Sequence, residues 1–506
     1  MTRFLAPQEN PWVEARPAVT GEDRRRPPAA AREKGTGVFL EKDSRPLFCG
    51  SSALPSQHVS PGGAGLLLPL IVCLTALPPI AAAAEPATAK PKEKADMLLS
   101  PQSIAARIRK HRTAEVTLTL ASRSGRPVTN QAVTVRQTRH KFLFGSNAFR
   151  IDPMDKGPLQ RGYQKRFSEL LNFGTLPFYW GSYERRRGQT AARRIRTMAQ
   201  WCRDNNIRTK GHPLCWHTVS PRWAGELTVD EVHRLQLNRI TREVKGFAGL
   251  IDTWDVVNEA VIMPDFRGDK NPITPLCRKL GTVELIKQTF AAAGKANGKA
   301  TLLLNDYDTS PKYERLIEQC LAAGVKIDTI GIQSHMHGGY WGAKRAWEVC
   351  ERFARFNRPL HFTELTLISG PMKKSIRWHG PRYDDWSTTP EGEKRQAEQV
   401  AEFYTVLFSH PAVEAITWWD FSDHSAWLGA PSGLIRKDMS PKPAYERLIS
   451  LVKKKWWTGE KKLKTNSSGR VKLRGFLGDY AVESAAGKGT FRLDRAGAVS
   501  VKAVVK

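Results

Sequence analysis

Eight short apolar runs lie in the middle of the chain, and polar or aromatic residues gather where each run ends. Such runs, rich in branched and aromatic side chains, are typical of buried β-strands. Helical patterns separate them: Thr228 and Glu231 form a capping box before one, and Ser310 and Gly324 bound another. Eight strands alternating with helices predict an α/β protein with a (β/α)8 TIM barrel. The runs are KFLFGSNA from Lys141, NFGTLPFYW from Asn172, TKGHPLCWH from Thr209, IDTWDVVNEA from Ile251, ATLLLNDYD from Ala300, TIGIQSHMH from Thr329, PLHFTELTL from Pro359 and EAITWWDFSD from Glu414.

Strand-like segments also lie on both sides of this region. Residues 114–137 alternate around the turn SGRPVTN, and residues 470–504 give the runs RVKLRGF, GDYAVES, GTFRLD and AVSVKAVV. Two strands alone are only marginally stable, so we expect both ends to pair into one small β-sandwich that flanks the barrel. The expected boundaries are 101–139 for the N-terminal β segment, 140–452 for the barrel and 453–506 for the C-terminal β segment.

The first hundred residues have a different character. Residues 1–60 hold no apolar pattern long enough to bury anything, which indicates a disordered or upstream-translated segment. Within residues 61–84, the apolar run LLLPLIVCLTAL is shorter than the ~20 residues that span a bilayer and is followed by small residues, as in a secretory signal peptide. Residues 85–100 form a linker. An uncleaved membrane anchor is the alternative, and either reading places the rest of the chain outside the cytoplasm, as a secreted, periplasmic or cell-surface protein.

The chain is strongly basic, with 79 Lys and Arg against 49 Asp and Glu and a net charge of +30. Such a charge is compatible with nucleic acid, an anionic membrane or an acidic polymer as partner. The cations are scattered over expected helix faces and form no domain-length stripe, so we expect a solvated basic surface and no specific nucleic acid. We also expect a monomer with no stable membrane span once the signal is cleaved.

Seven cysteines are present. Two of them precede the linker, and the other five lack the paired spacing of metal ligands. The sequence therefore predicts no metal site and no cofactor, and it leaves open whether any disulfide forms. The five are Cys202, Cys215, Cys277, Cys320 and Cys350.

Two of the strand-like runs deliver a carboxylate close to their C-terminal ends, Glu259 in IDTWDVVNEA and Glu364 in PLHFTELTL. Alternation puts Asp255 and Glu259 on one face of the strand and Asn258 on the other, so Asn258 and Glu259 should emerge together where the strand meets its loop. Barrel active sites lie at the C-terminal ends of the strands, and glycoside hydrolysis needs two carboxyl groups there. A surface Glu that caps the next helix is the alternative for Glu259.

Taken in order, the motifs GHPLCWH, WDVVNEA, NDYD, GIQSH, FTEL, WWDFSDHSAW and SPKPAY resemble glycoside hydrolase family 10, the endo-β-1,4-xylanase family, over roughly residues 140–452. The resemblance implies that Glu259 is the acid/base and Glu364 the nucleophile of a retaining double displacement, with carboxyls ~5–5.5 Å apart. It also implies that Asn258 binds the sugar 2-hydroxyl. Further residues that it assigns to the sugar or to the two carboxylates are His212, Trp216, Gln333, His335, Trp419 and Trp427, with Asn305 and Asp306 in support.

Three departures from the family pattern stand out. Pro177, Phe178 and Tyr179 replace a polar group that grips the −2 sugar, which predicts an aromatic wall there. Val219 stands where Gln is frequent. Thr366 replaces an Asp that steadies the histidine, and a hydroxyl supplies no charge, so imidazolium at His335 should be less favoured and the pH optimum should shift.

These observations predict a retaining endo-β-1,4-glycanase, with plant-type xylan as the leading substrate and no cofactor. A non-catalytic or weakly active carbohydrate-binding barrel and a β-glycanase for another polysaccharide are the alternatives, together with a basic nucleic-acid binder. The exact polysaccharide, the chain-length preference and the role of the β-sandwich stay open.

Overall fold

The computed structural model describes residues 97–267, 271–378 and 380–506. The expected upstream segment, the signal-like segment and the linker as far as residue 96 lie outside the described residues. Within the described part, no helix combines the length and the apolar character needed to cross a bilayer.

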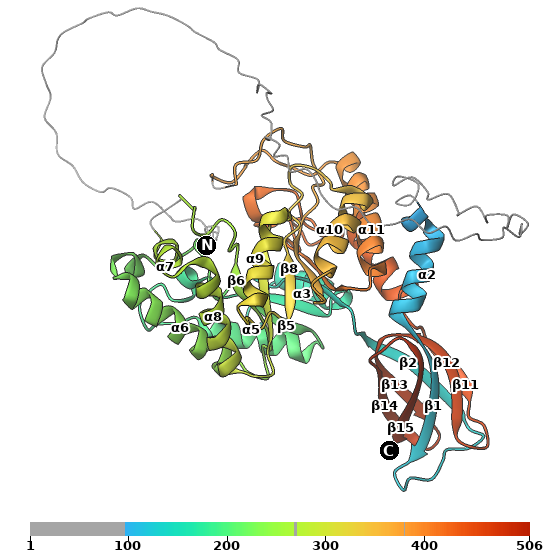
Figure 1. The fold of residues 1–506 in the computed structure, drawn as a ribbon. Coiled ribbons are helices and arrows are strands. Elements are labelled where there is room, and N and C mark those ends of the chain that lie inside the picture. The colour runs from blue at the N-terminus through green and yellow to red at the C-terminus, as the bar shows by residue number, and fades with distance from the viewer. Residues whose placement is uncertain (1–96, 268–270, 379) are drawn as a thin grey trace, which may run out of the picture. The chain divides into compact units, whose positions relative to one another are not determined.

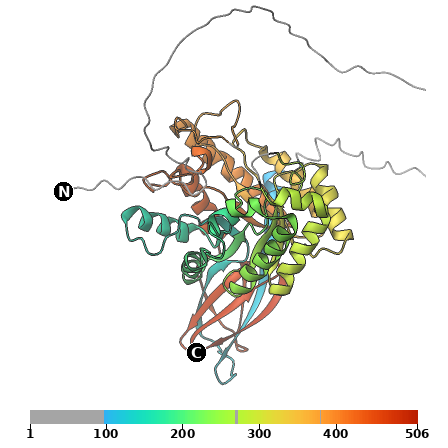
Figure 2. The same ribbon diagram turned by 90° about the vertical axis from the view of Figure 1, so that its left-hand side faces the viewer.

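Eight parallel strands close into a barrel in the order β10-β3-β4-β5-β6-β7-β8-β9 (Figures 1 and 2). Each of the eight expected runs supplies one of these strands, so the predicted fold class is confirmed. The strands are β3 (Leu143–Asn147), β4 (Phe173–Pro177), β5 (Arg208–His212), β6 (Thr253–Asn258), β7 (Thr301–Asp306), β8 (Thr329–Ile332), β9 (Leu360–Leu365) and β10 (Val413–Trp418).

Helices connect successive strands of the barrel, and several begin at the signals seen in the sequence. Thr228 and Glu231 form the expected capping box of α6, and Ser310 caps α9. The α-helices of this part are α3 (Pro158–Leu170), α4 (Trp180–Tyr183), α5 (Ala192–Asp204), α6 (Val229–Gly246), α7 (Ile273–Leu280), α8 (Thr282–Ala296), α9 (Pro311–Ala322), α10 (Gly342–Ala354), α11 (Pro390–Ser409) and α12 (Pro443–Ser450). Short turns of other helix types are η1 (Arg222–Glu226), η2 (Trp427–Gly429) and η3 (Leu451–Lys455).

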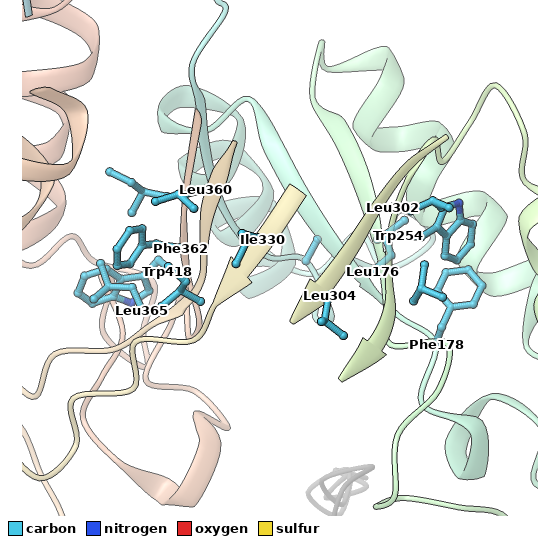
Figure 3. Close-up of a cluster of buried hydrophobic side chains, with 14 of the residues drawn as sticks. Leu176, Phe178, Trp254, Leu302, Leu304, Ile330, Leu360, Phe362, Leu365 and Trp418 are labelled. Atoms are coloured by element: carbon cyan, nitrogen blue, oxygen red, sulfur yellow. The ribbon is translucent and has the colours of Figure 1, made fainter. Parts of the chain in front are cut away.

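Apolar side chains of the barrel strands form the main core (Figure 3). Strand β6 contributes Trp254 and strand β7 contributes Leu302 and Leu304, and all three are buried. Gly211 in the neighbouring β5 leaves room for the large indole, because a Cβ at that position would overlap the Trp254 ring. This packing fixes the strands that carry the polar residues of the barrel mouth.

The two ends of the chain pair into two further sheets, ordered β12-β1-β15 and β11-β2-β13-β14. Strand β1 pairs with β12 and β15, and β2 pairs with β11 and β13, as expected for one flanking sandwich. A separate apolar core that includes Val116, Val135 and Tyr480 stabilises it. The strands are β1 (Thr113–Ser122), β2 (Ala132–His140), β11 (Lys461–Lys464), β12 (Arg470–Phe476), β13 (Gly478–Ser484), β14 (Gly487–Leu493) and β15 (Gly497–Val505).

Two elements of this part were not predicted, strand β11 and helix α2 (Pro101–Arg112). The helix starts with Ser100 as its cap and ends in a basic turn. Its last residue, Arg112, is buried and donates hydrogen bonds to the carbonyls of Phe408, His410 and Val413, at 2.5–2.7 Å. The flanking part is thereby bonded to the connection between α11 and β10 of the barrel.

Candidate active site

Glu259 directly follows β6 at the C-terminal end of the barrel. A bulge between Asp255 and Val257 shifts the register, so that Asn258 pairs with Asn305 of β7. Asn258 and Glu259 emerge together at the strand end, as expected, and the Asn258 amide contacts the Glu259 carboxylate. The bulge interrupts the strict alternation of faces and lets Asn258 point into the barrel mouth. Glu259 then adopts a left-handed backbone (φ 55°) and donates its N–H to the Asn305 carbonyl.

The carboxylate of Glu259 contacts neutral donors. Its Oε2 accepts from the Trp216 indole N–H at 2.9 Å, and its Oε1 accepts from the Gln333 amide at 3.1 Å and from the Asn258 amide at 3.3 Å. Burial and the charge of Glu364 raise the pKa of Glu259 to about 8, although the bonds from Gln333 and Trp216 oppose the rise. The group is therefore protonated at neutral pH.

Glu364, in β9, has different neighbours. Its Oε1 accepts from the Asn305 amide at 2.8 Å, its Oε2 lies 3.1 Å from His335 Nε2, and His212 Nε2 lies 4.0 Å from Oε1. Burial acts to raise the pKa of Glu364, but His212, His335 and the Lys210 ammonium outweigh it and hold the pKa below its ordinary value. Glu364 is therefore ionised under the same conditions in which Glu259 keeps its proton.

Asn305 connects the surroundings of the two carboxylates. Its amide donates to Asn258 Oδ1 at 2.7 Å and to Glu364 Oε1 at 2.8 Å, and its Oδ1 accepts from the Thr363 hydroxyl at 2.6 Å. Gly331 in β8 leaves the space for this side chain, because a Cβ there would overlap Asn305 Oδ1. The Asn305 side chain is thus bonded both to Asn258, which lies beside Glu259, and to Glu364.

Asp306, the next residue, is buried and holds the loop after Glu259. Its carboxylate accepts the backbone N–H groups of Val261 and Asp308, both at 3.0 Å. Burial raises the pKa of Asp306 to about 7, and its charge adds to the rise at Glu259.

Two residues that the sequence analysis did not assign, Lys210 and Asp255, lie behind His212. The Lys210 ammonium is 2.6 Å from Asp255 Oδ2, which is 2.7 Å from His212 Nδ1, and all three side chains are buried. Burial acts to raise the pKa of Asp255, but Lys210 and His212 hold it below its ordinary value. The signal that could have found Asp255 is the alternation of its strand, which puts it on the same face as Glu259.

The tryptophans of the expected site surround the two histidines. The Trp419 ring meets His212 and His335 at centroid distances of 5.3 and 5.8 Å, and Trp427 meets His335 at 4.7 Å. Trp419 is only 6% exposed, so it packs as a wall of the mouth. Every expected site residue therefore lies at the C-terminal end of the barrel.

The expected aromatic wall at Pro177, Phe178 and Tyr179 is formed by one residue only. Tyr179 packs against His212 and Trp216, at 5.3 and 5.4 Å, and the nearby charges of Glu364 and Glu259 add to the burial that raises its pKa. Pro177 ends β4, and the Phe178 ring turns into the core against Trp254 and Phe247, because neighbouring residues of extended backbone point to opposite sides. Of these three residues, Tyr179 alone faces the carboxylates.

Val219 has a left-handed backbone (φ 51°) and accepts the Gly181 N–H through its carbonyl. The Val219 carbonyl thus links the loop after β5 to α4. This contact is made by the backbone of the residue that stands where Gln is frequent.

The hydroxyl of Thr366 contacts the two residues after His335. The hydroxyl accepts the Met336 N–H at 3.0 Å and lies 3.2 Å from His337 Nδ1. A parallel bridge pairs His335 with Thr366, and this pairing turns the two side chains to different neighbours. His335 Nδ1 is buried without a hydrogen-bond partner in the described part of the chain. The expected shift of the pH optimum stays a prediction.

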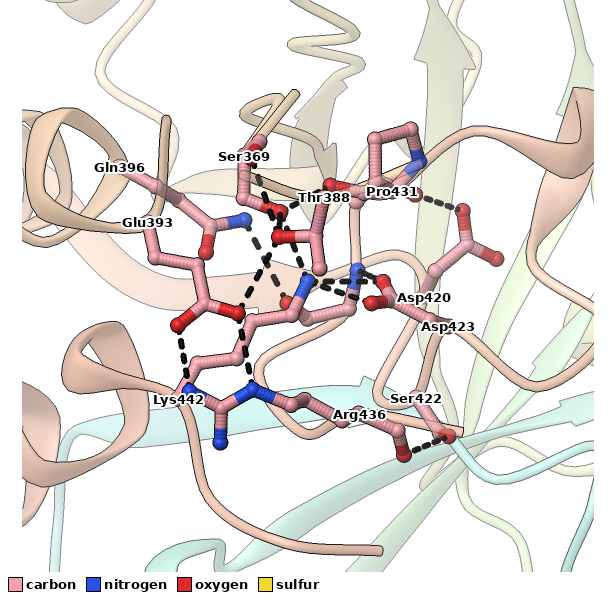
Figure 4. A network of polar contacts seen from close by, with 12 residues as sticks. Ser369, Thr388, Glu393, Gln396, Asp420, Ser422, Asp423, Pro431, Arg436 and Lys442 are labelled. Carbon is pink, nitrogen blue, oxygen red and sulfur yellow. Dashed lines mark hydrogen bonds and ion pairs between the residues drawn. The ribbon is translucent and has the colours of Figure 1, made fainter. Parts of the chain in front are cut away.

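A polar network holds the loop that carries Trp427 (Figure 4). The buried Lys442 of the SPKPAY motif donates to Ser369 Oγ and to Asp423, each at 2.8 Å, and Arg436 pairs with Glu393 of α11. Asp420 accepts the Trp427 N–H at 3.1 Å. The network joins the segments that follow β9 and β10, so Trp427 is held by a rigid support.

The described residues contain no group of His, Cys, Asp and Glu side chains that could hold a metal ion. All five cysteines of this part are buried free thiols, so none of them forms a disulfide with another.

A closed (β/α)8 barrel with two buried carboxyl groups at its mouth, one protonated and one ionised, defines a carboxylate-pair site of the kind used in glycoside hydrolases. The sequence matches the family model described as "Glycosyl hydrolase family 10" over residues 174–451, more than half of the chain. The chain belongs to this family.

Several characterised proteins are similar to the chain. Anti-sigma-I factor RsgI6 of Acetivibrio thermocellus is 25% identical over 76% of this chain and 47% of its own length. Endo-1,4-beta-xylanase B of Thermotoga neapolitana is 28% identical over 50% of this chain and 71% of its own length. Native xylanase 10B of Thermotoga maritima shares the fold, with a TM-score of 0.53 and 24% identity over 62% of this chain and 96% of that one. The chain spans less than half the length of the first curated relatives that it matches, at 47%, 35% and 38%.

Proposed function

We propose that the chain is a retaining endo-β-1,4-glycanase, with xylan as its main substrate. Glu259 is the acid/base and Glu364 the nucleophile. The observation that carries this proposal is the contrast between the two carboxyls, because the hydrogen bonds to Glu259 come from neutral donors whereas His335, His212 and Lys210 lower the pKa of Glu364. The relatives named as xylanases support the choice of substrate.

In the first step Glu259, with its raised pKa of about 8, donates its proton to the leaving glycosidic oxygen. The ionised Glu364 attacks the anomeric carbon at the same time and forms a covalent glycosyl-enzyme. In the second step Glu259 takes a proton from water, which displaces Glu364 and restores the original anomeric configuration.

The change of role at Glu259 follows from electrostatics. The charge of Glu364 is the second cause of the raised pKa of Glu259, after burial. Esterification of Glu364 removes this charge, so the pKa of Glu259 falls and the group becomes able to act as a base. The two steps therefore use the same pair of residues in opposite protonation states.

Asn258 is oriented for the sugar 2-hydroxyl. Its Oδ1 accepts from both Asn305 and Gln333, at 2.7 and 3.2 Å, which directs the amide NH2 toward Glu259 and the mouth. A hydrogen bond from this amide to the 2-hydroxyl strengthens as positive charge develops on the ring, so it favours the transition state. The apolar faces of Trp419 and Trp427 suit the CH-bearing faces of the sugar.

A second candidate is a carbohydrate-binding barrel without strong catalysis. The observation that favours it is the similarity over 76% of the chain to a protein named as an anti-sigma factor. The presence of both Glu259 and Glu364, in different surroundings, argues for catalysis.

We also propose secretion, on the basis of the apolar run within residues 61–84 and the small residues after it. Residues 140–452 would then form the catalytic unit of a monomer, with 101–139 and 453–506 as its accessory sandwich; the pairing of β1 and β2 with the C-terminal strands supports this division.

The test is a reducing-sugar assay on xylan, mixed-linkage glucan and mannan, combined with ¹H NMR of the first products. Cleavage of xylan with the β-anomer formed first is expected, and Glu364→Gln is the matched inactive control. An α-anomer formed first would contradict the retaining mechanism. Preferred cleavage of another polymer would show that xylan is not the main substrate. Binding of xylan without cleavage would favour the carbohydrate-binding barrel.

A further inference from the structure

The loop between β9 and α11 presents an indole at the barrel mouth. Trp378 is 40% exposed, whereas Trp419 of the same mouth is 6% exposed and Trp386 of the same loop is 4% exposed. A large apolar side chain left open to water beside an active site is a candidate contact for substrate.

Trp378 belongs to a series of contacting rings that begins with His335, beside the proposed nucleophile Glu364. His335 contacts Glu364, Trp427 packs on His335 at 4.7 Å, and Trp378 packs on Trp427 at 5.6 Å with an angle of 38° between the rings. Both indoles meet the buried ring of His337 nearly at right angles, at 86° and 90°. His337 therefore supports both indoles and holds them side by side. Trp427 is the one that contacts His335, beside Glu364.

The loop is held by its own contacts. Trp386 Nε1 donates to the Pro371 carbonyl at 2.7 Å, Tyr383 donates its N–H to the Leu428 carbonyl at 2.8 Å, and the Arg377 N–H donates to the Tyr383 hydroxyl at 2.9 Å. The Lys373 ammonium lies 4.5 Å from the centre of the Tyr383 ring. A ring positioned in advance loses little conformational entropy when it binds a ligand.

We propose that Trp378 is a binding platform for an outer pyranose of the same β-linked glycan whose inner sugar is cleaved at Glu259 and Glu364. Trp378 contacts Trp427, which in turn contacts His335 beside Glu364, so a sugar next to the one at Trp427 can reach Trp378. The inference rests on the proposed function and adds a sugar position to it. A protein or membrane partner is the other possible occupant of this surface.

The experiment compares linear β-1,4-xylo-oligosaccharides from xylotriose to xylohexaose as substrates of Trp378→Ala, Trp378→Phe and the wild type. We expect Trp378→Ala to lower kcat/KM for xylohexaose by roughly tenfold, which corresponds to about 1.4 kcal/mol, and to change it for xylotriose by less than about twofold. Trp378→Phe should keep most of the activity. The matched control is Val504→Ala, which truncates a side chain of the flanking sandwich that is also 40% exposed.

Calorimetry of xylohexaose and xylotriose with Glu364→Gln, alone and combined with Trp378→Ala, gives a readout that needs no turnover. Selective weakening of xylohexaose binding supports the platform. Equal losses for all lengths, or no loss, would overturn it while leaving the proposed function intact if the wild type cleaves xylan. Absence of both cleavage and xylohexaose binding in the wild type would overturn the proposed function and this inference together.

Discussion

Glu259 and Glu364 are the same kind of side chain at the same end of one barrel, yet their surroundings differ in charge. The hydrogen bonds that Glu259 accepts come from an indole and two amides, which carry no net charge, and one imidazole nitrogen, His217 Nε2, lies 3.9 Å from its Oε2. Glu364 faces two imidazoles and, behind them, the buried Lys210–Asp255 pair. The fold thus gives two identical side chains different neighbours, most of which come from other strands or the loops after them.

The largest effect is expected from removal of the ionised member of the pair. Glu364→Ala should lower kcat on xylan by about 10⁴-fold or more, because it removes the group that we propose as the nucleophile. Added azide should restore part of the turnover on an activated aryl glycoside and give a product of inverted configuration. Wild-type turnover by this variant would contradict the assignment, and circular dichroism checks that the fold is kept.

Removal of the protonated member should cost less, and the cost should depend on the leaving group. Glu259→Ala is expected to lower kcat/KM on xylan by roughly 10²–10⁴-fold, the usual contribution of general acid catalysis. Aryl xylosides whose phenol leaves without protonation should form the glycosyl-enzyme at a nearly normal rate. Kinetics with phenols of graded acidity measure this, and equal losses for all leaving groups would exclude Glu259 as the acid.

The Lys210 ammonium is one of the groups that keep the pKa of Glu364 low. Lys210→Met should raise the pKa of Glu364, so activity should disappear at a higher pH on the acid side, with kcat/KM reduced by about tenfold near pH 5. Lys210→Arg should restore the wild-type profile.

The matched control is Lys442→Met, which breaks the other buried Lys–Asp ion pair, that of Asp423. It should lower the melting temperature without moving the acid limb of the pH profile. If the acid limb of the pH profile moved equally in both variants, the effect of Lys210 on activity would come from stability alone.

The smallest effect concerns stability. The folded-state pKa of Glu259 is raised from 4.5 to about 8, so between these values the unfolded chain releases a proton that the folded chain keeps, and stability falls as pH rises through this window. Glu259→Gln removes this penalty and should stabilise the protein by about 1–3 kcal/mol at pH 8, with little change at pH 4. Denaturant unfolding at both pH values measures it, and an equal gain at both would contradict the raised pKa.

The apolar runs were sufficient to predict the barrel strands, because each run is rich in branched and aromatic side chains, ends in polar or aromatic residues and alternates with helical patterns. Strand β11, by contrast, is four mostly exposed residues, and α2 has few apolar side chains, so neither gave a signal. Their formation depends on pairing with β2 and on the bonds of Arg112, contacts between residues far apart in the chain.

The site shows the same division. Glu259 and Glu364 stand in recognisable motifs, but the inward turn of Asn258 depends on a bulge that only the register with β7 reveals. Lys210 and Asp255 come together from two strands, and the partner of the Thr366 hydroxyl depends on the bridge between Thr366 and His335, which follows β8. Residue identity predicted which groups carry the chemistry, and tertiary register decides what each of them touches.

The most direct test is a ¹³C NMR titration of the protein with labelled Glu side chains, in which Glu259→Gln and Glu364→Gln assign the two resonances. Glu259 should titrate near pH 8 and Glu364 below 4.5, and the Glu364→Gln variant should move the Glu259 titration to lower pH. Equal titration of the two groups near their ordinary pKa, or Glu364 as the group that holds the proton at neutral pH, would contradict the assignment of the two roles.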